Sequence, residues 1–182
     1  MMSALSVLYF VLPFPLVLTI HGAEEVAMRH RWMQAHRQML AARFPKCIPL
    51  VAHFASMSTG AWAIATLEKL LVLLVVTGSI LIGVPYAPLV WAALFMAFSI
   101  HLALHILQSL VLGGYVPGLV SSVLCLPYAF VVMESICRAY GAVELLLLGG
   151  AGVVAMAINL RLAHWLGFVL IRILNRLFHT SR

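Results

Sequence analysis

The stretch HGAEE, residues 21–25, puts one imidazole and two carboxylates at the end of an otherwise apolar segment. His21, Glu24 and Glu25 stand at positions i, i+3 and i+4, so on a helix they share one face. In hydrocarbon an isolated charged side chain costs about 2.5–3.5 kcal/mol on insertion scales, so such groups need partners. A divalent metal ion would neutralise both carboxylates at once. Metal binding is therefore the first chemistry that this stretch indicates.

Two further stretches carry imidazoles that can join such a site. In HLALH, His101 and His105 stand at i and i+4, with Gln108 about a turn further along the same stripe. Two histidines at that spacing can bind one metal ion from one helix, as in HExxH zinc sites. NLRLAH adds Asn159 and His164. Imidazoles and carboxylates together suit zinc or non-haem iron, bound as one or two ions.

The composition places these groups in a membrane protein. The chain has 182 residues, of which 64% are hydrophobic and 9% are charged, whereas a soluble domain carries about 25% charged residues. The net charge of +6 comes from basic residues beside apolar segments. They are therefore expected to set topology and to contact anionic lipid, with no role in binding nucleic acid. We expect a single integral membrane domain over residues 1–182.

The predicted fold is all-α, a polytopic transmembrane helix bundle of about five spans plus an interfacial or re-entrant segment. A span needs about 20 apolar residues, and five stretches qualify: residues 4–27, 61–84, 87–112, 117–137 and 143–170. Residues 48–60 form the predicted interfacial or re-entrant segment. Residues 28–46 form a basic cytoplasmic segment, either an amphipathic surface helix or a solvated loop.

Basic residues also predict the orientation of the chain. Five Lys and Arg residues fall within 28–46, and Arg172 and Arg176 lie near the carboxy terminus, so both regions are predicted to be cytoplasmic. No Lys or Arg precedes the first apolar segment. That pattern fits a retained anchor with the amino terminus outside better than a cleaved signal peptide.

With this orientation, histidines from three separate spans reach a similar depth. His21 lies about six residues, or roughly 9 Å, inside the cytoplasmic end of the first span. His101 and His105 fall in the cytoplasmic half of the third span, and His164 falls in that of the fifth. The predicted metal ligands are therefore His21, Glu24, Glu25, His101, His105 and His164. Glu25 is the candidate general base, and Gln108 and Asn159 are further candidate catalytic residues.

Other polar residues are weaker candidates. His53 lies in the interfacial or re-entrant segment and can line the site from there. Glu68 is a candidate partner of the ligands, while the adjacent Lys69 is expected to snorkel toward the cytoplasmic interface. The same groups also have two interpretations without metal: hydrogen bonds between packed helices, or a proton relay.

The ordered set HGAEE, HLALHILQ, YVPG and NLRLAH resembles the HXXEE-domain family of small bacterial integral membrane proteins, over roughly residues 10–168. The resemblance implies a location in the bacterial cytoplasmic membrane. It names no reaction. It implies one shared set of functional residues: His21, Glu24, Glu25, His101, His105, Gln108, Tyr115, Pro117, Gly118, Asn159 and His164.

Three functions remain open at this point. The first is a metal-dependent membrane enzyme, hydrolytic or oxidative, acting on a lipid or another amphiphilic substrate at the cytoplasmic leaflet. The second is a non-catalytic membrane module whose polar cluster fixes helix packing. The third is a proton or metal transporter. The purely aliphatic middle of the second span argues against it, because a transport path needs polar groups through the whole depth of the membrane. Membrane lipid is the expected partner, and the sequence leaves the oligomeric state open.

Overall fold

The computed structural model describes residues 7–179, and its regular elements there are all helices. Five of them are long and apolar enough to cross a membrane, which confirms the predicted all-α bundle with five spans. They are α2 (Pro13–Arg43), α4 (Thr59–Leu81), α5 (Ala87–Leu112), α6 (Leu119–Ala139) and α7 (Ala142–His179). Three short elements complete the chain: the π-helix η1 (Val7–Val11), the 3-10 helix η2 (Pro45–Cys47) and α3 (Ile48–Ser56).

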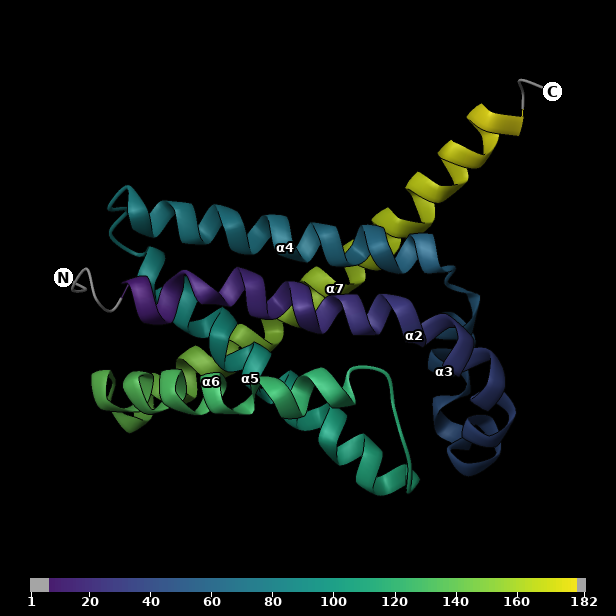
Figure 1. Ribbon diagram of the computed structural model, residues 1–182, viewed down its shortest axis with the longest axis horizontal. Coiled ribbons are helices and arrows are strands. Elements are labelled where there is room, and N and C mark those ends of the chain that lie inside the picture. Colours follow the sequence, from purple (N-terminus) through teal and green to yellow (C-terminus); the bar gives the residue numbers. More distant parts are fainter. Residues whose placement is uncertain (1–6, 180–182) are drawn as a thin grey trace.

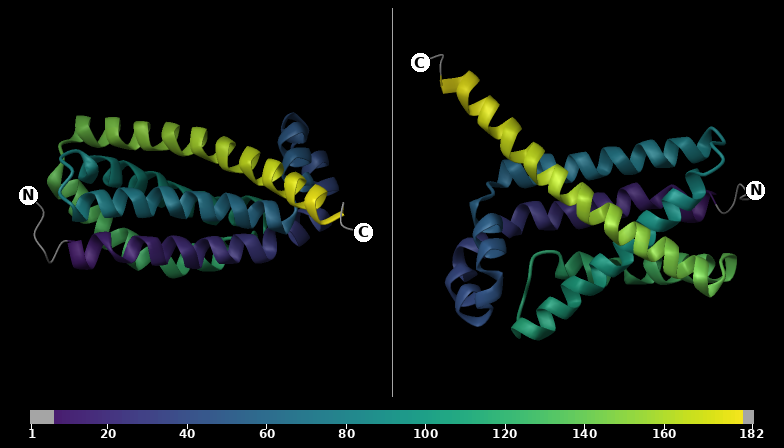
Figure 2. Two further views of the ribbon diagram at one scale, coloured as in Figure 1. Left: turned by 90° about the horizontal axis from the view of Figure 1, so that it is seen from above. Right: turned by 180° about the vertical axis from the view of Figure 1, so that it is seen from behind.

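The five long helices form a bundle in which α2 and α4 run side by side (Figure 1). Helices α5 and α7 cross them obliquely, and α7 packs against both α4 and α5 (Figure 2). The first described turn and the end of α7 lie at opposite ends of the bundle (Figure 1). An odd number of spans requires this arrangement.

Helix α2 is longer than the predicted first span, whose start at residues 4–6 lies outside the described residues. It continues without a break to Arg43, where the sequence predicted a separate basic segment over 28–46. Residues 28–43 contain no Gly or Pro and are rich in Met, Arg, Gln and Ala, which are good helix formers. The helix ends just before Pro45, because the residue ahead of a proline disfavours helical backbone and Phe44 has φ −128° and ψ 68°.

Residues 48–60 do not cross the bundle. Helix α3 has nine residues, or roughly 13 Å of rise, which is less than half of a hydrocarbon core. It packs against α2 at one end of the bundle (Figure 1). Ser58 then starts α4, since its side chain accepts a hydrogen bond from the Ala61 N–H at 3.2 Å.

A cluster of aromatic side chains joins α2 to α5 and fixes their register. Phe14 packs edge-on against Phe95 with ring centroids 4.9 Å apart, and it also contacts Trp91 and Phe98. Such edge-to-face pairs contribute about 0.5–1.5 kcal/mol beyond the area they bury. His21 lies two turns beyond Phe14 on α2, and His101 lies three residues beyond Phe98 on α5. The aromatic cluster therefore brings the histidines of the two helices to the same level.

Candidate metal centre

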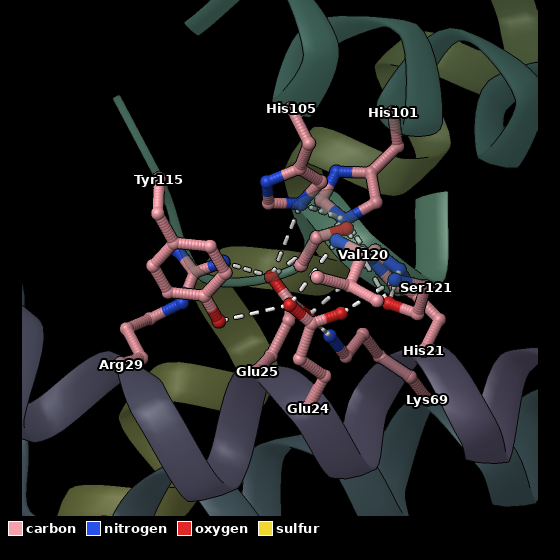
Figure 3. Close-up of polar contacts among 11 residues, drawn as sticks. His21, Glu24, Glu25, Arg29, Lys69, His101, His105, Tyr115, Val120 and Ser121 are labelled. Carbon is pink, nitrogen blue, oxygen red and sulfur yellow. Dashed lines mark hydrogen bonds and ion pairs between the residues drawn. The ribbon is translucent and has the colours of Figure 1, made fainter. Parts of the chain in front are cut away.

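Three imidazoles point their Nε2 atoms at one another between α2 and α5 (Figure 3). His101 Nε2 lies 3.1 Å from His21 Nε2 and 3.1 Å from His105 Nε2. A ring nitrogen carries either one proton or one lone pair. His101 Nε2 can therefore form only one ordinary two-centre hydrogen bond, although it faces two imidazole nitrogens. Three lone pairs directed at one central cation would satisfy all three rings together.

Glu25 adds a carboxylate to the three imidazoles. Its Oε1 lies 3.4 Å from His105 Nε2 and 3.8 Å from His101 Nε2, and its Oε2 lies 3.9 Å from His21 Nε2. The four candidate ligand atoms all lie within 4.8 Å of one another. Two donors that each bind zinc at about 2.0–2.2 Å stand at most roughly 4.4 Å apart. Small side-chain movements therefore suffice for all four donors to reach one ion.

Two helices supply this whole group through the same local geometry. His21 and Glu25 are one turn apart on α2, as are His101 and His105 on α5. Side chains at i and i+4 lie above one another on a helix face, so each helix presents a pair of donors. Three of the four residues, His21, Glu25 and His105, are at most 3% exposed, and the side chain of His101 is 28% exposed. The spacing seen in the sequence thus translates directly into a four-donor group.

A second layer of contacts orients two of the rings. Ser121 Oγ on α6 lies 3.0 Å from His21 Nδ1, so the ring nitrogen facing away from the cluster is held by a hydrogen bond, as is usual for metal-binding histidines. Gly118 lies directly beneath the His105 ring. A Cβ there would come within 2.8 Å of His105 Cε1, and the glycine has φ +93°. Both the space and the backbone conformation at this position require glycine.

Glu24 faces α6 and not the four-donor group, although the sequence predicted it as a ligand. Its carboxylate accepts hydrogen bonds from the Ser121 N–H at 2.6 Å, the Val120 N–H at 3.3 Å and the Tyr115 O–H at 2.9 Å (Figure 3). The first turn of a helix offers free N–H groups that favour an anion. Burial, together with the hydrogen bond to Glu24 and its charge, raises the pKa of Tyr115 to about 12. The phenol therefore remains a donor at neutral pH, and Glu24 fastens α2 to α6.

Two cations also contact Glu25, and the sequence assigned neither of them to the site. Arg29 forms an ion pair with Oε1, and Lys69 Nζ on α4 lies 3.7 Å from Oε2. Lys69 was expected to snorkel to the interface, but it turns inward because it meets a buried carboxylate there. The Arg29 guanidinium also lies 4.7 Å from the centre of the Trp62 ring. The i+4 spacing from Glu25 to Arg29 was a signal for the first of these pairs.

The other predicted residues lie outside the four-donor group. His164 Nδ1 faces His53 Nε2 of α3 at 3.2 Å, and the His164 ring also contacts the rings of Phe54 and Trp62. Asn159 donates from Nδ2 to Glu68 Oε2 at 3.1 Å. Gln108 is exposed and lines a separate cavity of about 370 Å³ between α2, α3 and α5. Of the six predicted ligands, the group contains His21, Glu25, His101 and His105.

An apolar cavity of about 330 Å³ opens beside the group. His21, Glu25, Lys69, His101 and Asn159 line its polar end. Side chains from α2, α4, α5 and α7 line the rest, including Phe14, Leu18, Leu73, Val76, Leu94 and Met156. This volume falls at the lower end of the range for small-molecule sites, about 300–1,000 Å³. The site thus combines a few convergent polar groups with a mostly apolar wall.

The fold and the site together define a helical protein with five candidate membrane spans and a buried His/Glu group that can hold a metal ion. The family model described as "Protein of unknown function with HXXEE motif" matches residues 12–132, which is more than half of the chain. The chain belongs to this family, as the sequence resemblance indicated. No curated protein and no solved structure matches it significantly.

Proposed function

We propose that this chain is a metal-dependent membrane enzyme acting on a lipid or another amphiphile. The observation that carries the proposal is the group of three imidazole nitrogens and one carboxylate within 4.8 Å, buried between α2 and α5. In the proposal His21, His101 and His105 bind one divalent transition metal ion, zinc or non-haem iron. Three histidine ligands with an open fourth position are typical of catalytic zinc sites.

Glu25 has the position of a general base in this proposal. Its two oxygens already contact Arg29 and Lys69, which hold the carboxylate beside the imidazoles. There it can take a proton from a water molecule and deliver it to the leaving group of an ester or amide. Di-iron carboxylate centres use several glutamates, whereas the four-donor group of the described residues contains one. Hydrolysis with a single ion is therefore favoured over oxidative chemistry with two.

Metal analysis of the purified full-length protein tests the proposal. We expect about one zinc or iron ion per chain in the wild type, and its loss in His101→Gln and His105→Ala. His53→Gln is the matched control, because His53 is exposed and contacts His164 outside the group. A folded wild-type protein that contains no metal, and that neither zinc nor ferrous iron stabilises against heat, would overturn the proposal.

One observation favours a second candidate, a non-catalytic module. Arg29 and Lys69 already compensate the buried Glu25 carboxylate, so the polar cluster can fasten helices without any ion. This candidate predicts that a strong chelator leaves the unfolding temperature unchanged. It also predicts that Glu25→Gln destabilises the fold, because the two cations lose their partner.

A further inference from the structure

The apolar cavity runs from the four-donor group toward the end of the bundle where the described chain begins. Its wall residues Phe14 on α2, Val76 on α4 and Val90 on α5 lie on that side of His21, Lys69 and His101 respectively. These separations are seven, seven and eleven residues in the sequence, or roughly 10–16 Å of helical rise. The cavity therefore has the length of one alkyl chain of medium size.

The charged groups around Glu25 contain more positive than negative charge once a divalent ion is bound. Glu25 supplies one negative charge, whereas Arg29 and Lys69 supply two positive charges and a divalent ion two more. Glu24 and Glu68 lie further out and are already held by Tyr115, α6 and Asn159. Even with these two carboxylates included, four positive charges exceed three negative ones. Surplus charge in a membrane interior is costly, so an anionic group is the complementary occupant.

Lys69 lines the polar end of the apolar cavity, whereas Arg29 lines the separate cavity beside Gln108. The Arg29 guanidinium pairs with Glu25 through one terminal nitrogen, while its Nε is buried and has no hydrogen-bond partner among the described residues. Lys69 lies on the opposite side of the Glu25 carboxylate from Arg29, where its ammonium group can donate to an anion in the cavity (Figure 3).

We propose that the site binds an anionic single-chain amphiphile, with its acid group beside Lys69 and the four-donor group and its alkyl chain in the apolar cavity. This inference rests on the proposed function and names the class of its substrate or product. A carboxylate and a phosphate both meet the requirement, because the recognised chemistry is one compact anion joined to one alkyl chain. A neutral alcohol of the same length has the alkyl chain but lacks the anion.

Photo-crosslinking in phosphatidylcholine nanodiscs tests the inference on the full-length, metal-loaded protein. A dodecanoic acid with a terminal diazirine should label inward-facing wall residues far from the histidines, such as Leu73 and Val76. Unlabelled dodecanoate or dodecyl phosphate should compete at least about tenfold better than dodecanol, and the two acids distinguish a carboxylate from a phosphate ligand. Labelling confined to outward-facing residues, such as Leu71 and Leu110, would overturn the inference, as would equal competition by dodecanol.

Variants separate the cavity from the metal centre. Val76→Phe narrows the cavity and should abolish labelling while leaving the metal content unchanged. Val75→Phe is the matched control, because Val75 is the preceding residue on α4 and is 62% exposed. Leu94→Phe repeats the test from α5 if Val76→Phe does not fold. Equal labelling of all these variants would overturn the inference.

The measurements of metal content and of labelling test the proposed function and the amphiphile inference separately. A metal-loaded protein that binds no acid would contradict the inference and leave the proposed function standing. A metal-free protein whose labelling depends on Val76 and on Lys69→Met would support the amphiphile site and contradict the proposed metal chemistry.

Discussion

At the residue scale, the His105 ring depends on a backbone position on another element. Gly118 ends the loop before α6, and its left-handed conformation lets the chain pass under the imidazole with no side chain between them. The loop is itself held to α2, since Trp32 donates to the Tyr115 carbonyl at 2.8 Å and Tyr115 donates to Glu24. The ring orientation is thus set by the α5–α6 loop as well as by α5.

We expect Gly118→Ala to weaken metal binding more than any other single-methyl change in this loop. The added Cβ must displace the His105 ring, and alanine at positive φ destabilises the fold by about 1 kcal/mol or more. Metal affinity should fall by about 10–100-fold, as is typical when the support of a ligand is disturbed. Gly114→Ala is the control, because a Cβ there meets nothing within 4 Å. Equal metal affinity in both variants would contradict this account.

At the element scale, the site requires that α5 stay between α2 and α7. Helix α7 reaches α5 through Gly152, which packs on the Ala93 backbone, and α4 through Gly167, which packs on the Ala61 backbone. Small residues permit such close approach between helices in membranes. These two contacts also determine which residues of α7 face the cavity, among them Asn159 and Met156.

Gly152→Val is expected to lower the unfolding temperature in detergent, with a destabilisation of about 1–3 kcal/mol. Its Cβ would meet the Ala93 carbonyl, a backbone group that cannot rotate away. Gly150→Val makes the same change two residues earlier, where a Cβ has open space, and so corrects for the loss of helix propensity. An equal fall in both variants would show that the helix contact contributes nothing.

The sequence predicted those parts of the fold and site that depend on local pattern. Apolar stretches of about 20 residues located the spans, and i, i+4 spacing located His21 with Glu25 and His101 with His105. What depends on tertiary contacts was not predictable in the same way. Lys69 turns inward because it meets Glu25 of α2, and His164 of α7 meets His53 of α3. Periodicity within one helix carries no information on either contact.

At the scale of the whole molecule, the ends of the bundle differ in charge. The basic residues that follow Glu25 lie on the part of α2 that leads to α3, and Lys46 lies in η2. Arg172 and Arg176 lie in the last part of α7, which points to the same end of the bundle (Figure 1). The positive-inside rule predicts that this end faces the cytoplasm and that the first described turn of the chain lies on the opposite side. In this orientation the four-donor group lies nearer the cytoplasmic end, and the apolar cavity extends toward the outer leaflet.

The natural cysteines allow this orientation to be tested without introducing a new cysteine. Cys47 is exposed beside α3, Cys137 is exposed in the last turn of α6 at the other end of the bundle, and Cys125 is buried. A membrane-impermeant maleimide applied to intact cells should label Cys137 and should reach Cys47 only after permeabilisation. Cys47→Ser and Cys137→Ser assign each signal, and Cys125 serves as an internal control that stays unlabelled in the folded protein. Labelling of Cys47 in intact cells would show that the orientation is the opposite one, in which the four-donor group lies toward the outer face and its cavity extends toward the cytoplasmic leaflet.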